Sequence, residues 1–303
     1  GIKNIVLPDS LSLIQKGVIA GCNNLESITI PFVGSFEKSG SKVEAFLGYY
    51  FGASSVTDHE NYIPKSLKEV TVTKVVGDNA FRNCSSLTKI TIKDGVEKIG
   101  IKAFYGCGGL NEIVIPNSVT YIAGGAFQDC SGLTSLTIPY VGSSSSSYAG
   151  IGSWFGTSDI NKIDEFIPGS LKTVTVTQVI RTDAFRGWTG LEHINICQGV
   201  TTIGDRAFYD CKGISDITLP DSIVRIGVSA FRGCEGITNI IIPDSVTTIA
   251  NYAFAGCVNL ESMTVPFAGG TLQDDPGIGR WFGASSYAEN NVYVPESLKS
   301  ITV

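Results

Sequence analysis

The residues of this chain that could do chemistry are its eight cysteines and two histidines, and their spacing limits what they can do. Seven of the cysteines hold the same position in a repeated unit, namely Cys22, Cys84, Cys107, Cys130, Cys211, Cys234 and Cys257. A metal site needs ligands that converge on one point, as paired C-x-x-C motifs do, whereas this spacing supplies one thiol per unit. Disulfides need a specific direction of both Cβ atoms, so an occasional bridge between adjacent units is only the alternative. The pattern predicts free, buried thiols that act as small hydrophobic residues.

The remaining candidates for chemistry lack a supporting motif. Cys197 stands where other units have Pro116 or Pro220, at the expected end of a strand, so we expect it to be more exposed and reactive than the other cysteines. His59 and His193 belong to no H-E-x-x-H sequence, and the chain has no G-x-S-x-G, P-loop or EF-hand string. The sequence therefore predicts no catalytic residue, no cofactor and no metal.

The unit that carries these cysteines recurs along the whole chain. It is 23 residues long, approximately L-x-x-I-x-I-P-x-S-V-x-x-I-G-x-x-A-F-x-G-C-x-x, and clear copies begin at Leu87, Leu110, Ile214 and Ile237. Repeats of about 20–29 residues with apolar residues at fixed offsets are typical of leucine-rich solenoids, in which each unit buries its apolar face against its neighbours. Such a core grows lengthwise, so 303 residues need not divide into two domains.

One unit, residues 110–132, shows how the coil is expected to form. Ile113 and Ile115 alternate with outward residues as in a strand, and Pro116 ends the pairing because it has no N–H. A second buried pair follows, and Phe127 of the Ala-Phe dipeptide fills the core before a turn returns the chain. We predict a leucine-rich-repeat solenoid: a curved right-handed coil of about twelve units of 20–42 residues, with a parallel β-sheet on one face and little helix. Residues 1–303 would form one domain, which we interpret as a fragment of a longer chain.

Three units are longer than the others, at 25–66, 133–170 and 260–297. Aligning Ile151 with Ile122 of a normal unit places one insertion before that isoleucine, and a second insertion follows the Trp154-Phe155 pair. This pair, like Trp281-Phe282, could offer a platform for stacking on sugars. Its alignment with Ala-Phe favours core packing instead.

Two surfaces are candidate binding sites. The first comprises the divergent insertions, with the candidate residues Phe36, Glu37, Lys42, Tyr148, Asp274 and Asp275. Loops on a rigid scaffold can change without affecting the core, although plain loop decoration is an equally good interpretation. The second surface is the exposed face of the sheet, with the candidates Thr137, Thr175 and His193. Threonine dominates this face, and Tyr, Trp and Arg are missing, so weak or multivalent contact is expected there rather than one strong hot spot.

The unit resembles the BspA-like (Treponema pallidum-type) branch of leucine-rich repeats. The run L-P-D-S-I-V-R-I-G-V-S-A-F-R-G-C from Leu219 to Cys234 has the Leu-Pro-x-Ser, Ile-Gly and Ala-Phe-x-x-Cys signatures of that family in register, and the resemblance covers essentially the whole chain. It implies a secreted or surface-anchored protein, usually bacterial, that is used in adhesion or host contact. It brings no catalytic residue.

Charge and hydropathy narrow the class of partner. With 22 basic and 28 acidic residues the net charge is -6, and no basic cluster is present, which argues against nucleic acid or an anionic membrane surface. No apolar run is long enough to insert into a membrane. We therefore expect a non-enzymatic, extracellular, monomeric binding scaffold for a protein or glycan ligand. The alternative is a passive spacer that displays another domain.

Overall fold

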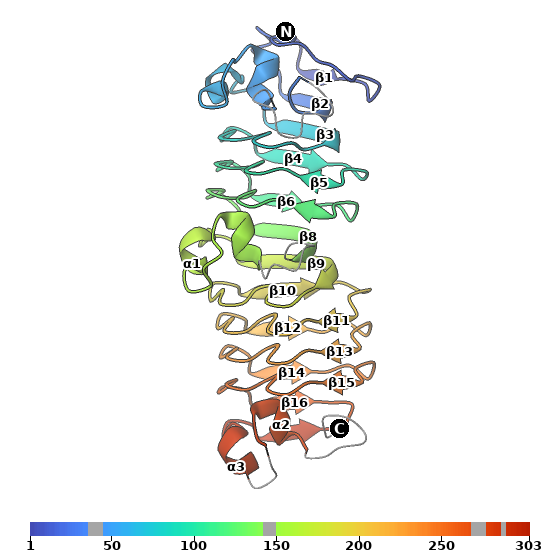
Figure 1. The fold of residues 1–303 in the computed structure, drawn as a ribbon, viewed down its shortest axis with the longest axis vertical. Coiled ribbons are helices and arrows are strands. Elements are labelled where there is room, and N and C mark those ends of the chain that lie inside the picture. Colours follow the sequence, from blue (N-terminus) through green and yellow to red (C-terminus); the bar gives the residue numbers. More distant parts are fainter. Residues whose placement is uncertain (36–44, 142–149, 268–276, 286–288) are drawn as a thin grey trace.

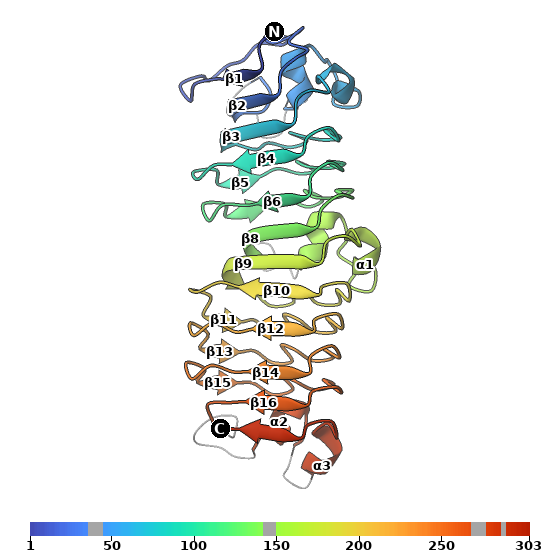
Figure 2. The same cartoon turned by 180° about the vertical axis from the view of Figure 1, so that it is seen from behind.

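The computed structural model describes residues 1–35, 45–141, 150–267, 277–285 and 289–303. The coils stack along one long axis, with the N-terminus and the C-terminus at opposite ends of the column (Figures 1 and 2). The described part of the chain contains one contiguous hydrophobic cluster that extends from Ile14 to Phe282. This is the arrangement expected when each repeat buries its apolar residues against the next.

One face of the column carries one strand from every coil. The strands are β1 (Asn4–Val6), β2 (Ser27–Phe32), β3 (Glu69–Val75), β4 (Lys89–Ile92), β6 (Glu112–Val114), β8 (Ser135–Val141), β9 (Thr173–Ile180), β10 (His193–Ile196), β12 (Asp216–Thr218), β14 (Asn239–Ile241), β16 (Ser262–Thr264) and β17 (Ser300–Thr302). In the part of the chain that the structure describes, these strands form three successive hydrogen-bonded groups, with breaks in the pairing after β4 and after β12. Every pairing among them in the described residues is parallel, with equivalent positions opposite each other. The predicted twelve parallel strands are confirmed.

A second, narrower ladder follows further along each normal coil. Its two-residue strands are β5 (Lys98–Ile99), β7 (Tyr121–Ile122), β11 (Thr202–Ile203), β13 (Arg225–Ile226) and β15 (Thr248–Ile249). The isoleucine of each strand points into the core and its partner residue points outward. The second buried pair of the repeat is therefore a short strand.

The Ala-Phe residues build the spine of the core. The rings of Phe81, Phe104 and Phe127 stack with centroids 5.7 and 5.4 Å apart and planes within 4°. A second stack begins at Phe185 and ends at Phe254. All of these rings are buried, as predicted.

Hydrogen bonds between coils explain the other fixed residues of the motif. The Phe104 N–H donates to the Ala126 carbonyl of the next coil at 2.8 Å. The thiol of Cys130 donates to the Phe104 carbonyl of the preceding coil at 3.1 Å, and the hydroxyl of Ser118 donates to the Val96 carbonyl at 2.8 Å. Cysteine and serine are thus selected by side-chain hydrogen bonds to the preceding coil, whereas the backbone bond of Phe104 sets the register between coils.

The three enlarged coils contain the helical segments of the structure. These are η1 (Leu47–Phe51) and η2 (His59–Tyr62), η3 (Ile151–Phe155) and α1 (Ile163–Phe166), and α2 (Gly279–Phe282) and α3 (Asn290–Tyr293). In the second of these coils the Trp154 carbonyl accepts from the Phe127 N–H of the preceding coil, and the Ile151 N–H donates to the Ala184 carbonyl of the next coil. The helical turn η3 therefore forms backbone hydrogen bonds with both the preceding and the following coil.

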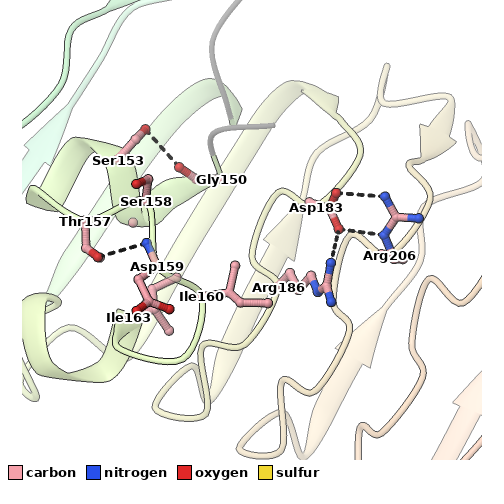
Figure 3. Close-up of a pocket in the computed structure, with 11 residues that line it drawn as sticks. Gly150, Ser153, Thr157, Ser158, Asp159, Ile160, Ile163, Asp183, Arg186 and Arg206 are labelled. Atoms are coloured by element: carbon pink, nitrogen blue, oxygen red, sulfur yellow. Dashed lines mark hydrogen bonds and ion pairs between the residues drawn. The ribbon is translucent and has the colours of Figure 1, made fainter. Parts of the chain in front are cut away.

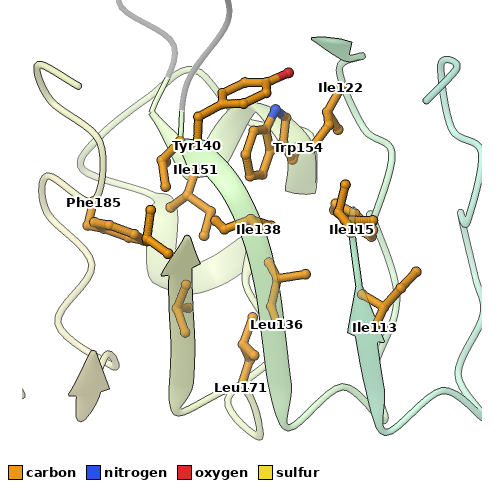
Figure 4. Packing of buried hydrophobic residues seen from close by; sticks show 14 of the residues in the cluster. Ile113, Ile115, Ile122, Leu136, Ile138, Tyr140, Ile151, Trp154, Leu171 and Phe185 are labelled. Carbon is orange, nitrogen blue, oxygen red and sulfur yellow. The ribbon is translucent and has the colours of Figure 1, made fainter. Parts of the chain in front are cut away.

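The phenylalanine column is interrupted at this turn. Phe155 is tilted by 39° against Phe127, and Ile151 lies on the side of Phe185 (Figure 4). Trp154 is 1% exposed and packs edge-on against Tyr140, at 6.1 Å and 80°. Trp281 is also buried, so both Trp-Phe pairs are core residues, and neither tryptophan is a platform for a ligand.

The predicted alignment of Ile151 with Ile122 is wrong. Val141 pairs with Ile180, and Ile180 pairs with Ile203, so Val141 holds the position of Ile122 in the second ladder. The first insertion consequently follows that position instead of preceding it.

The expectation that the proline ends the strand also fails in two enlarged coils. Pro31 lies within β2 and Pro139 lies within β8. The register shifts between Ile138 and Tyr140, which accommodates the missing N–H at a bulge.

Candidate functional site

The predicted insertion residues cannot be placed. Phe36, Glu37, Lys42, Tyr148, Asp274 and Asp275 lie outside the described residues, and their role stays a prediction.

The predicted residues on the sheet face are brought together. Thr137 lies opposite Thr175 in the β8–β9 register, and Thr175 lies opposite Asn195, whose amide donates to the Thr175 hydroxyl at 3.3 Å. His193 lies opposite Asp216 on β12 and is exposed. A shallow hollow of about 530 Å³ lies over β9, β10 and β12 and is lined by residues that include His193, Asn195 and Asp216, but by neither Thr137 nor Thr175. The outward face is therefore polar and open, and its groups can form hydrogen bonds with a ligand.

A second hollow lies beside the second enlarged coil, on the flank that carries its helical segments. It has a volume of about 280 Å³ and separates residues 157–163 from the turns of the next two coils (Figure 3). Gly156 ends η3 with φ 101°, a left-handed conformation that glycine adopts without strain. Thr157 then accepts a hydrogen bond from the Asp159 N–H at 3.1 Å, which shapes one wall.

The opposite wall is an ion-pair cluster around Asp183. Its carboxylate accepts from Arg206 Nε at 2.8 Å and Nη2 at 2.9 Å, and from Arg186 Nη1 at 3.4 Å. Asp183 is 7% exposed, and the Arg186 guanidinium lies 4.9 Å from the ring centre of Tyr209. The bidentate pairing fixes the Arg206 guanidinium in place, whereas Arg186 makes one longer contact with the carboxylate and packs on the Tyr209 ring. The carboxylate accepts three hydrogen bonds from the two arginines, so the hollow presents fixed polar groups that suit a polar ligand.

His59 is a buried residue whose environment the sequence did not reveal. Its Nδ1 accepts from the Gly48 N–H at 3.2 Å, and its Nε2–H therefore donates to the Arg82 carbonyl. Burial lowers the pKa of His59, so the imidazole is neutral. The sequence did contain an indication that His59 is buried. His59 stands five residues before Pro64, and Ile163, which is also buried, stands five residues before Pro168. His59 thus replaces an apolar core residue.

The cysteines follow the predicted pattern. All eight are free, six are buried, and Cys197 is among the two that are half-buried. The other is Cys22, whose exposure the repeat did not indicate. Burial raises the pKa of the Cys130 thiol to about 12, which keeps it protonated and unreactive.

Two further observations bear on the class of site. Within the ranges that the structure describes, no group of three or more His, Cys, Asp or Glu residues could hold a metal ion. The helices in those ranges are all too short or too polar to cross a bilayer.

Comparison with known proteins identifies the repeat. The family model described as BspA type Leucine rich repeat region matches in six copies, over residues 1–45, 59–175 and 165–275. No curated protein matches the chain.

Three bacterial proteins are among the similar solved structures. A leucine-rich repeat protein from Bacteroides ovatus is 23% identical, with 87% of this chain and 78% of that chain covered and a TM-score of 0.38. A leucine rich cell surface protein from Faecalibacterium prausnitzii is 23% identical over 99% of this chain and 79% of that chain, with a TM-score of 0.36. The T. pallidum leucine rich repeat protein is 23% identical, covers 65% and 62% of the two chains, and has a TM-score of 0.22.

Proposed function

The chain belongs to the BspA-type leucine-rich repeat family, and from that premise we propose that it is a non-enzymatic binding scaffold that acts outside the cell. One observation supports this proposal: one hydrophobic core continues through all coils, although three of the coils are enlarged. Their helical segments lie on one side of the column, while the strands stack without interruption of the core (Figures 1 and 2). The additional segments leave the core continuous, and such segments on a rigid scaffold commonly carry the residues that bind a partner.

The chemistry of the described surfaces supports binding over catalysis. The Asp183 carboxylate is held by two arginines, and the sheet face offers threonine and asparagine groups that donate and accept hydrogen bonds. In the described residues neither surface shows a nucleophile hydrogen-bonded to a base, the pair that covalent catalysis uses.

The state of the thiols is compatible with a place outside the cell. Extracellular proteins usually oxidise their cysteines to disulfides. Here six thiols are buried in the core, and five of them donate to a carbonyl of the preceding coil, as Cys234 does to Phe208 at 3.1 Å. Such thiols are protected from oxidants, so the chain can keep them reduced in an oxidising environment.

The experiment is a screen of the purified protein on arrays of extracellular matrix proteins and glycans. We expect reproducible capture of at least one class of ligand. Two variants locate the contact: Thr137→Glu with Thr175→Glu places charge on the sheet face, whereas shortening residues 143–149 and 271–276 to the length of a normal unit removes the divergent insertions. Loss of capture in one variant with unchanged thermal stability assigns the surface. If neither array captures the protein, the passive spacer is the better account.

A further inference from the structure

Each enlarged coil ends its second helical segment with an exposed aromatic residue. Tyr62 is the last residue of η2, Phe166 the last of α1 and Tyr293 the last of α3. Their exposed fractions are 48%, 37% and 46%. Each stands two residues before a proline, so the three occupy equivalent positions in the enlarged coils. We call these three residues the aromatic flank.

The backbone that follows each aromatic residue is anchored in the same way. A serine four residues later donates to the carbonyl of the leucine that opens the same coil, at 2.7 Å in all three cases: Ser66 to Leu25, Ser170 to Leu133 and Ser297 to Leu260. The residue between the aromatic side chain and the proline points inward in the first two coils, with Ile63 6% and Ile167 3% exposed. The three segments are therefore anchored by the same hydrogen bond, and in each of them the aromatic residue faces outward.

The surroundings of Phe166 show the chemistry of a suitable ligand. Phe166 lines a shallow groove of about 390 Å³ together with Asp129, Ser131, Glu165 and Ser170. An aromatic ring can stack on the C–H face of a sugar, while carboxylates and hydroxyls at its rim bind the hydroxyl groups of the sugar. A purely apolar partner would leave these polar groups without hydrogen bonds.

The charge on this flank disfavours anionic polymers. Glu60 lies on η2 beside Tyr62, and Asp164 and Glu165 lie on α1 beside Phe166. Asp164 and Glu165 both line the groove, and Asp164 also accepts a hydrogen bond from the Thr189 hydroxyl at 2.8 Å. Acidic groups at the rim, together with the net charge of -6, repel sulfated or carboxylated chains.

The spacing of the aromatic flank fits a long ligand. Four strand steps separate the coils of β2 and β8, and five separate those of β8 and β16, which at about 4.8 Å per step gives roughly 19 and 24 Å. A short sugar can reach one aromatic residue only, whereas an extended chain can reach all three and gains through effective concentration.

We propose that the aromatic flank binds an extended neutral polysaccharide, with one sugar ring stacked on each of Tyr62, Phe166 and Tyr293. This inference rests on the proposed function and names its ligand class and site.

The test measures capture of soluble polysaccharides by the whole chain. The probes are a neutral β-glucan, a neutral α-mannan and a galactomannan, with a trisaccharide of each as the short ligand and heparin as the anionic polymer. We expect at least one neutral polymer to bind about 100-fold or more tightly than its trisaccharide, and heparin not to bind. Each of Tyr62→Ala, Phe166→Ala and Tyr293→Ala should weaken capture by about tenfold, the effect of removing one stacking interaction. Phe166→Tyr should retain it.

The matched control is Tyr121→Ala, which removes an aromatic residue that is 41% exposed on β7, away from this flank. It should leave capture unchanged. Full capture by the triple alanine variant, or a preference for heparin, would overturn the inference. If the chain captures matrix proteins but no neutral polysaccharide, the inference fails and the binding scaffold stands. If it captures neither, both fail.

Discussion

Replacing Phe208 by alanine should destabilise the coil column by about 3–5 kcal/mol, the range for truncating a buried aromatic residue. The ring is fully buried, and its centroid lies 5.2 Å from both Phe185 and Phe231, with planes within 7° and 5°. The substitution removes both of these ring–ring interactions, each of which contributes about 0.5–1.5 kcal/mol beyond area burial. The backbone hydrogen bonds of the turn are unaffected, so the neighbouring coils cannot easily close the cavity. We therefore expect the upper half of the range.

Urea unfolding followed by tryptophan fluorescence measures this effect, because Trp154, Trp188 and Trp281 are all buried. The stability of a coil column depends on interactions between nearest neighbours, so the destabilisation should be concentrated around Phe208. In single-tryptophan variants, Trp188 in the adjacent coil should report unfolding at lower urea than Trp281, which lies three coils away.

The control is Thr218→Ala on the exposed face of β12, which should change the free energy of unfolding by less than about 0.5 kcal/mol. A change under about 1 kcal/mol for Phe208→Ala would refute the assignment of the phenylalanine column as the spine of the core.

Three further predictions concern titratable groups. Neutral His59 has a lowered pKa, so its stabilising contribution is complete above about pH 6.5 and is lost as the pH falls below that value, where the unfolded chain binds the proton. His59→Ile, which introduces the residue found at the equivalent position of the second enlarged coil, should flatten thermal stability between about pH 6.5 and 5, and an unchanged pH profile would contradict this. Alkylation of the folded protein followed by mass spectrometry should modify Cys22 and Cys197 alone among the eight cysteines, and rapid labelling of a third thiol would show that the column opens locally. Asp183→Asn should lower the free energy of unfolding by about 1.5–3 kcal/mol, since it removes the charged acceptor of Arg206, and calorimetry that finds no loss would show the ion pair to be dispensable.

The fold could be predicted from the sequence because the same residues repeat at a fixed period. Leu110, Ile113 and Phe127 recur at the same offsets in many units, so one interpretation of the pattern is tested several times within the chain. The alternation of buried and exposed strand residues and the burial of six thiols follow from that pattern and are confirmed.

The sequence was least informative where a coil departs from the repeat. Ile151 precedes a glycine and therefore matches the Ile-Gly signature, but its N–H bonds to the next coil, and Val141 takes the place in the second ladder. A signature of two residues cannot distinguish a strand position from the start of a helical turn, because both bury one isoleucine beside a small residue. The hollow around Asp183 was missed for a different reason: Arg206 lies one repeat further on, and their pairing depends on the register between coils.

The enlarged coils also explain how this column can carry a variable surface. In the second of them the helical turn places Trp154 against the preceding coil and Ile151 against the next, so the ring stack ends at Phe127 and restarts at Phe185. The edge-on packing of Trp154 on Tyr140 takes the place of the stacked ring pair that a normal unit would form there. Both neighbouring coils keep a backbone hydrogen bond to the enlarged coil, through the Trp154 carbonyl on one side and the Ile151 N–H on the other, so the additional chain is joined to the column without breaking it. Changes on the flank of the enlarged coils are therefore separated from the stability of the core, which is the property a binding surface needs in order to diversify.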